Sequence, residues 1–203
     1  MAKLTKAQIE EKNRKFLRLG KKQRFVQVAK DALAQAAIGK YKITTGKYFN
    51  EYKGEFSEHA MYSPNRFQIE LLAPTSPTCE VCARGALFLS RARCGNTVDY
   101  RDAENTPILP DAPIEIMQLL EQFFEGWFRR VQVRGTLIGA DHGVRIEETI
   151  RLSEKHNWNS NRIFVDILNN VIQNRGDYVT PDGTNLTAKT WEHFIKQSKG
   201  KKS

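Results

Sequence analysis

The chain has 203 residues, a length that suits one compact domain. Its content of 40% hydrophobic and 10% aromatic residues is too high for a disordered chain, and no stretch approaches the roughly 18 apolar residues of a membrane span. The first residues carry lysines without an apolar run, and three cysteines lie within sixteen residues. We therefore expect a cytoplasmic protein without a secretory signal or a disulfide framework.

The net charge of +9 is concentrated at the two ends of the chain. Residues 1–30 contain ten basic and two acidic side chains, and residues 196–203 contain four lysines and no acid, whereas the rest has 18 basic and 21 acidic side chains. We predict a basic helical arm (1–22), a globular domain (23–195) and a basic disordered tail (196–203). Such ends can bind nucleic acid weakly and in a salt-dependent way. Because they lack interleaved aromatic residues, we favour a role in solubility.

The first half of the chain has two regions of helical spacing, separated by an aromatic segment. A charged helix with few apolar positions is predicted over 5–19, and we expect it to dock loosely. A stronger helix is predicted over 23–38, with Gly39 as its stop. Residues 41–70 are aromatic and polar, which predicts loops and at most one short strand.

The second half is predicted to be helical, with polar loops between the helices. A turn at 74–78 leads into a helix expected from Cys79 to Arg93, and a polar loop is expected at 96–112. Further helices are predicted at 114–130, 144–155, 161–174 and from Thr187 onward, with a glycine-bearing loop at 135–143. Pro113, directly before the first of these ranges, suits the start of a helix.

Three side chains of this half are expected to face the core. Ile146 and Ile150 should point inward from their helix, and Trp158 should pack between asparagines that cap the next helix. These patterns predict a mainly α fold, a single compact domain of about six or seven helices with a few short strands or loops.

Five segments stand out for their order and spacing between residues 24 and 181: Arg24–Asp31, Gly46-x-Tyr48, Cys79-x-Val81-Cys82-Ala83-x-Gly85-Ala86-Leu87, Leu119–Glu125 and Ile167–Gly176. Together they resemble a family of uncharacterised proteins from bacteria and their phages, and the cysteine segment is the most specific of them. The resemblance implies a phage or mobile-element setting, the host cytoplasm as location and a role against host defence. It implies no activity, and no catalytic residue is carried over from it.

Cys82 is a candidate nucleophile, because it lies where a loop is expected to run into a helix. The start of a helix is electropositive and favours a thiolate. With His142 as base and Asp141 to orient it, Cys82 would make a cysteine-dependent hydrolase or transferase. The alternative is that Cys82 and its small neighbours let another helix pack closely. We favour packing, because no triad partner can be placed from the sequence.

The cysteines also resemble half of a zinc site, since Cys79 and Cys82 have the C-x-x-C spacing. Cys94 lies at the far end of the same predicted helix, about 18 Å from Cys82 at 1.5 Å per residue. One ion cannot bridge that distance, so we predict no metal and no cofactor.

The start of the cysteine-bearing helix also suits an anion. Arg84, Arg91 and Lys30 are candidates for charge-assisted bonds beside Cys82, and Tyr48 is a candidate to stack on a base. Neither a GxxxxGK[ST] nor a GxGxxG loop is present, which disfavours nucleotide hydrolysis. We predict a non-enzymatic binding protein for a small phosphate-bearing, nucleotide-like ligand or a host protein. The alternatives are a Cys82 enzyme and a weak nucleic-acid binder acting through its basic ends.

Overall fold

The computed structural model describes residues 4–44, 49–53, 64–73, 78–95, 111–124 and 143–192. Within these residues the chain is mainly α-helical, as predicted, and it has one small sheet. A further helical turn spans 188–192. The main elements are α1 (Lys6–Arg18), α2 (Lys21–Ala37), β1 (Tyr41–Ile43), β2 (Phe49–Lys53), α4 (Pro64–Leu72), β3 (Thr78–Val81), α5 (Ala83–Gly95), α7 (Ile114–Phe124), α9 (Gly143–Lys155) and α10 (Ser160–Gln173).

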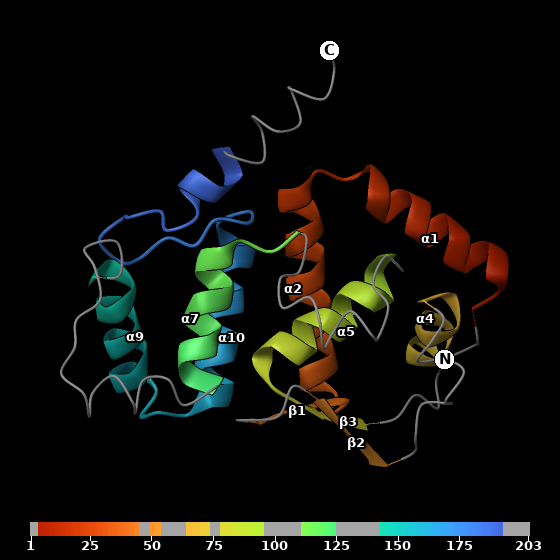
Figure 1. Cartoon of the computed structure of the whole chain (residues 1–203), viewed down its shortest axis with the longest axis horizontal. Helices are drawn as coiled ribbons and strands as arrows, with labels where there is room; N and C mark the ends of the chain where they lie inside the picture. Colours follow the sequence, from red (N-terminus) through yellow and green to blue (C-terminus); the bar gives the residue numbers. More distant parts are fainter. Residues whose placement is uncertain are drawn as a thin grey trace.

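Helices α2 and α5 cross at the centre of the molecule, and the other elements surround them (Figure 1). Helices α1 and α4 pack against α5 on one side, whereas α7, α9 and α10 lie on the other. The sheet lies at the C-terminal end of α2. This arrangement buries α5 on nearly all of its faces, since only positions 84 and 93 of that helix are not fully buried.

The predicted bounds of α2 and α10 are confirmed to within two residues. Gly39, at a φ of 74°, follows α2 in the left-handed conformation that glycine tolerates best. At the start of α10, Asn159 accepts a hydrogen bond of 3.0 Å from the backbone N–H of Arg162. That bond satisfies one of the donors that a helix leaves unpaired at its first turn.

Helix α1 is docked more firmly than its sparse apolar pattern suggested. Ile9 and Phe16 are buried, and the ammonium of Lys12 donates to a carbonyl of α5. The side-chain amides of Asn13 and Gln68 exchange two hydrogen bonds of 2.9 and 2.7 Å. Two apolar anchors and these polar contacts therefore replace the broad apolar stripe of an ordinary packed helix.

The sheet has the strand order β1-β3-β2, with β1 parallel and β2 antiparallel to β3. This corrects two expectations. Residues 41–70 contain two strands and α4 rather than loops with one strand at most. Cys79 lies on β3, opposite Tyr41 of β1, and the helix expected to begin there begins only at Ala83.

The described part of the inward face of α9 is largely polar, which corrects the expectation for Ile150; the side chain of Ile146 lies outside the described residues. That side chain is 40% exposed, whereas Glu148, Leu152 and Ser153 are buried. The Glu148 carboxylate accepts a hydrogen bond from the hydroxyl of Tyr178 and two bonds of 2.7 Å from Arg151. Because its partners supply these bonds, the charged residue can be buried where the sequence pattern predicts an apolar one.

Trp158 is also placed differently from the expectation, since 52% of it is exposed. Asn157 and Trp158 have φ values of 48° and 58°, so two consecutive residues adopt the left-handed conformation in the turn between α9 and α10. Non-glycine residues adopt it rarely. The turn therefore directs Trp158 outward, although Asn159 caps α10 as predicted.

Residues near the two ends of the described chain contact each other. The ammonium of Lys22, at the start of α2, lies 2.5 Å from a carboxylate oxygen of Asp177. Next to Asp177, Gly176 has a φ of 102°, and a Cβ there would lie 2.5 Å from the Lys22 side chain. The Gly176 carbonyl accepts a hydrogen bond of 3.1 Å from the indole of Trp191. The C-terminal segment thereby closes onto the N-terminal helices.

Several predictions fall outside the described residues. These are most of the polar loop at 96–112, the last part of the helix predicted to reach residue 130, the glycine-bearing loop at 135–142 and the tail. Among the helices that are described, none is both long and apolar enough to cross a bilayer.

Candidate functional site

The three cysteines are buried and none forms a disulfide. Cys79 lies on β3, Cys82 directly precedes α5, and Cys94 lies in the last turn of that helix. The backbone N–H of Gly85 lies 3.5 Å from the sulfur of Cys82. Cys82 thus accepts a hydrogen bond at the position where a serine or aspartate commonly caps a helix. This local role fits the packing interpretation of Cys82.

The thiol of Cys94 is poorly suited to react. Burial raises its pKa to about 12, and the nearby cations Lys12, Arg93 and Arg91 offset this only in part. The thiolate is the nucleophilic form of cysteine, so very little of it is present near neutral pH.

The partners proposed for a catalytic Cys82 cannot be placed. His142 and Asp141 lie outside the described residues, as does the side chain of Tyr48. The described residues include His156, whose Nε2 lies 2.8 Å from Asp166 Oδ2. The same oxygen accepts a bond of 2.8 Å from Lys155, so this pair links α9 to α10. No group of three or more metal-ligating side chains occurs in the described parts of the chain.

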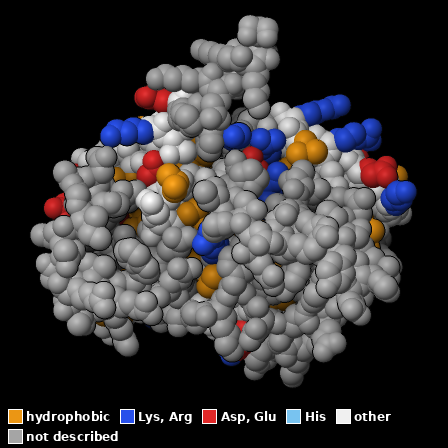
Figure 2. Space-filling model, in the orientation of Figure 1, with side chains coloured by type: hydrophobic (Ala, Val, Ile, Leu, Met, Phe, Trp, Pro, Cys, Tyr) orange, Lys and Arg blue, Asp and Glu red, His pale blue; other side chains and the backbone are white. Residues whose placement is uncertain are grey.

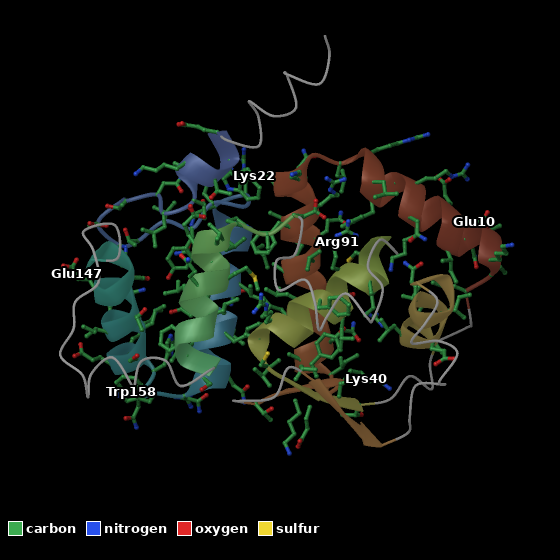
Figure 3. The ribbon with its side chains drawn as sticks, in the orientation of Figure 1. Glu10, Lys22, Lys40, Arg91, Glu147 and Trp158 are labelled. Carbon is green, nitrogen blue, oxygen red and sulfur yellow. The ribbon has the colours of Figure 1, made fainter. Side chains whose placement is uncertain are left out.

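Arg91 is bound within the molecule rather than facing an open site. Its Nε donates to Asp111 at 2.6 Å, and its guanidinium carbon lies 4.5 Å from the ring centre of Phe16. Arg24 contacts the other oxygen of Asp111 at 2.9 Å. Burial lowers the pKa of Arg91, and Asp111 opposes that effect. Figure 3 places Arg91 at the centre of the molecule, between α2 and α5.

This cluster has two arginines for one carboxylate. The Nη1 of Arg91 and the Nε of Arg24 are buried and have no hydrogen-bond partner in the structure as described. Of the other two predicted anion ligands, Lys30 lies at the exposed surface of α2, and Arg84 is half-buried in the first turn of α5. The anion site formed by these residues stays a prediction.

An apolar groove that no sequence pattern predicted lies between α2, β1 and α10. Its volume is about 700 Å³. Leu33 and Ala36 line it from α2, Ile43 lines it from β1, and Phe164 and Val165 line it from α10. Val165 is 41% exposed. Its volume and apolar lining are those of a binding pocket.

β1 forms the floor of this groove and is an edge strand. The Cys79 N–H donates to the Lys40 carbonyl at 2.9 Å, and the Thr44 N–H donates to the Val81 carbonyl at 2.8 Å. Backbone groups of alternate residues in a strand point to opposite edges, so Tyr41 and Ile43 direct their N–H and C=O groups away from β3. None of these groups has a backbone partner among the residues that the structure describes.

Basic side chains gather over α1 and the start of α2 (Figure 2). A second hollow, of about 670 Å³, lies here between the two helices. Its charges are mixed, because Glu11 lines it together with Lys12 and Lys15. Glu11 also contacts Arg14 at 2.7 Å and Lys15 at 3.5 Å. Part of the positive charge of α1 is therefore balanced within the helix itself.

No protein-family model, curated protein or solved structure matches this chain. The resemblance to proteins of bacteria and their phages stays a prediction from the sequence.

Proposed function

We propose that this is a non-enzymatic binding protein that holds an extended segment of another polypeptide along β1. The observation that carries the proposal is the edge of this strand that no other described strand pairs with, beside an apolar groove. Extended peptides often bind proteins by adding a strand to a sheet, with backbone hydrogen bonds for affinity and side-chain pockets for specificity.

The backbone of β1 supplies the hydrogen-bonding groups for an added strand. Tyr41 and Ile43 each direct one donor and one acceptor away from β3, a spacing that the backbone of an extended peptide matches. β1 is only three residues long and carries Lys42 at its centre. Short edge strands with a lysine resist indiscriminate pairing, so backbone bonds alone would hold a peptide weakly.

The groove supplies the pockets for side chains of the added strand. Alternate side chains of a bound strand would enter the space between α2 and α10 and cover Val165. Ile38, at the end of α2, is 65% exposed and lies directly before Gly39, which lines the groove. Covering such apolar surface favours binding by roughly 25 cal/mol per Å².

The cysteines support binding rather than thiol catalysis. All three are buried, Cys82 accepts a hydrogen bond from the first turn of α5, and burial suppresses ionisation of Cys94. The setting that we propose is the one implied by the sequence resemblance, a phage protein that acts on a protein of its host.

The test is a selection of binding peptides from a displayed library of random nine-residue sequences. Affinities of the selected peptides are then measured for the wild type, for Val165→Glu in the groove and for Ile150→Glu on α9. The two residues are almost equally exposed, at 41% and 40%, so the second variant controls for the new charge. We expect Val165→Glu to weaken binding at least tenfold and Ile150→Glu to leave it unchanged.

Two results would overturn the proposal. One is a library that yields no binding peptide, and the other is a set of peptides that bind both variants like the wild type. In the expected case, the backbone amide signals of Tyr41 and Ile43 shift when peptide is added.

A small phosphate-bearing ligand is a second candidate, favoured by the Nε of Arg24 and the Nη1 of Arg91, which are buried and have no hydrogen-bond partner among the described residues. Inorganic phosphate and a nucleoside monophosphate are the probes, with binding measured by titration calorimetry. We expect Arg24→Gln to abolish binding and Arg14→Gln, on the exposed side of α1, to preserve it. Absence of heat with both probes would exclude this candidate.

A further inference from the structure

We infer that the segment bound along β1 alternates apolar with acidic residues, and that an acidic side chain lies beside Lys42. This inference rests on the proposed function, and it names the chemistry of the partner. It follows from the two faces of the small sheet and from the charge that each face presents.

The two faces of the sheet differ in burial. Tyr41 and Ile43 of β1 are buried, as are Cys79 and Val81 of β3. Lys42, which lies between the two buried residues of β1, is exposed. Side chains alternate between the faces of a sheet, so a fourth strand beside β1 would continue the same alternation.

The buried face requires apolar side chains from the partner. Residues of the added strand on the same face as Tyr41 and Ile43 would point toward α2 and α10. The groove is lined there by Leu33, Phe164 and Val165, and Lys42 is the only charged residue among the described residues that line it. A charged side chain placed among Leu33, Phe164 and Val165 would lose its hydration, and none of these three residues could serve as its counter-ion.

The exposed face favours an acid. The ammonium of Lys42 lies 2.8 Å from a carboxylate oxygen of Glu80, its register partner on β3. An added strand would place a residue on the opposite flank of Lys42, with Cβ atoms about 5 Å apart. An acid at that position would complete a row of alternating charges, whereas a lysine or arginine would be repelled.

The experiment repeats the peptide selection on three forms of the full chain: wild type, Lys42→Glu and Lys189→Glu. Lys189 is an exposed cation of the helical turn 188–192 that does not line the groove, so its variant controls for the change in net charge. We expect Asp and Glu at one alternate position of the peptides selected by wild type and Lys189→Glu. We expect Lys and Arg at the same position in the peptides selected by Lys42→Glu.

A single substitution in one selected peptide measures how strongly the acidic residue contributes to binding. Replacing its acidic residue by lysine should weaken binding to the wild type by about two- to fivefold and should strengthen binding to Lys42→Glu. Since Lys42→Glu places a carboxylate beside Glu80, its thermal unfolding is measured first. If that variant unfolds, Lys42→Gln replaces it, and the acidic preference should then disappear without reversing.

The outcomes separate the inference from the proposed function. Peptides that require Val165 but show no acidic preference would overturn the inference and leave the proposed function intact. A preference that is the same in the wild type and in the Lys42 variants would also overturn the inference. Peptides that are indifferent to Val165→Glu would overturn both.

Discussion

The segment Thr78–Gly95 and the strand β1 lie side by side, but their roles are opposite. The first contains the three cysteines and two arginines to which the sequence assigns chemistry, and the structure buries most of these side chains. β1 contains no candidate site residue from the sequence, yet all three of its residues line the groove. Reactive residue types thus lie in the buried centre of this protein, while the binding groups that we propose belong to an edge strand.

The largest effect is expected at the buried centre of the molecule, where the carboxylate of Asp111 contacts both Arg24 and Arg91. We expect Asp111→Ala to lower the free energy of unfolding by about 3–5 kcal/mol, because it leaves two arginines without their counter-ion. Urea denaturation followed by circular dichroism measures this loss. The control is Glu11→Ala, whose exposed pairs should contribute less than about 1 kcal/mol. Equal losses in the two variants would contradict a structural role for the centre.

A smaller effect is expected at Cys82. Cys82→Ala should cost about 1 kcal/mol for the small void it leaves, and Cys82→Ser should cost about 1–3 kcal/mol if the hydroxyl is left unpaired. Both variants should bind the selected peptides like the wild type wherever they fold. In the native protein at neutral pH, iodoacetamide should label the cysteines far more slowly than in denaturant. Fast native labelling together with a folded, inactive Cys82→Ala variant would make this protein an enzyme.

The contacts of Asp166 that link α9 to α10 should make a pH-dependent contribution to the free energy of unfolding. Burial alone would raise the pKa of Asp166, but hydrogen bonds from His156 and Lys155 outweigh it and hold that pKa below 3.8. Because the folded-state pKa is the lower one, the stabilisation is complete above pH 3.8 and is lost as the pH falls through the folded pKa. We expect about 0.5–1 kcal/mol from these partly exposed pairs.

The measurement compares the Tm of the wild type and of Asp166→Asn at pH 7 and at pH 3. The difference between the two proteins should be largest at pH 7 and should shrink at pH 3. A difference that stays constant over this range would show that ionisation of Asp166 does not stabilise the fold.

The smallest change in stability is expected from reversing charge on α1. Arg14→Glu combined with Lys15→Glu changes two exposed side chains, so the free energy of unfolding should change by less than about 0.5 kcal/mol. Retention on a polyanion column at low salt should fall clearly. Deleting residues 1–20 is a poorer test, because α1 packs against α5. Unchanged retention would place polyanion binding elsewhere in the chain.

The sequence predicted the long helices best, because their apolar residues repeat over several turns. In α2 that spacing and a stop at Gly39 locate the element. β3 was missed, and only one short strand was expected where β1 and β2 lie, because β1 and β3 have only three or four residues and pair with partners 38 positions away. Trp158 was misplaced because its exposure results from two left-handed residues; asparagine adopts that conformation more readily than most residues, but tryptophan gives no sign of it.

The candidate site could be predicted even less well. Arg91 matched an anion ligand by residue type, but its carboxylate partner, Asp111, lies twenty positions further along the chain. The groove combines Leu33, Ile43 and Val165 from three elements, and each of these residues alone reads as ordinary core. A groove formed by elements that are far apart in the chain produces no local residue pattern from which it could be predicted.

The contact between Lys22 and Asp177 has a consequence for how the chain matures during translation. The two residues are 155 positions apart, so the N-terminal helices leave the ribosome long before the segment that closes onto them. Domains generally complete their folding as units. A nascent chain that ends after α7 would therefore hold α2 without α10 and without one wall of the groove. Binding should be acquired only after α10 has been synthesised, and a product truncated before α10 should not compete for the partner.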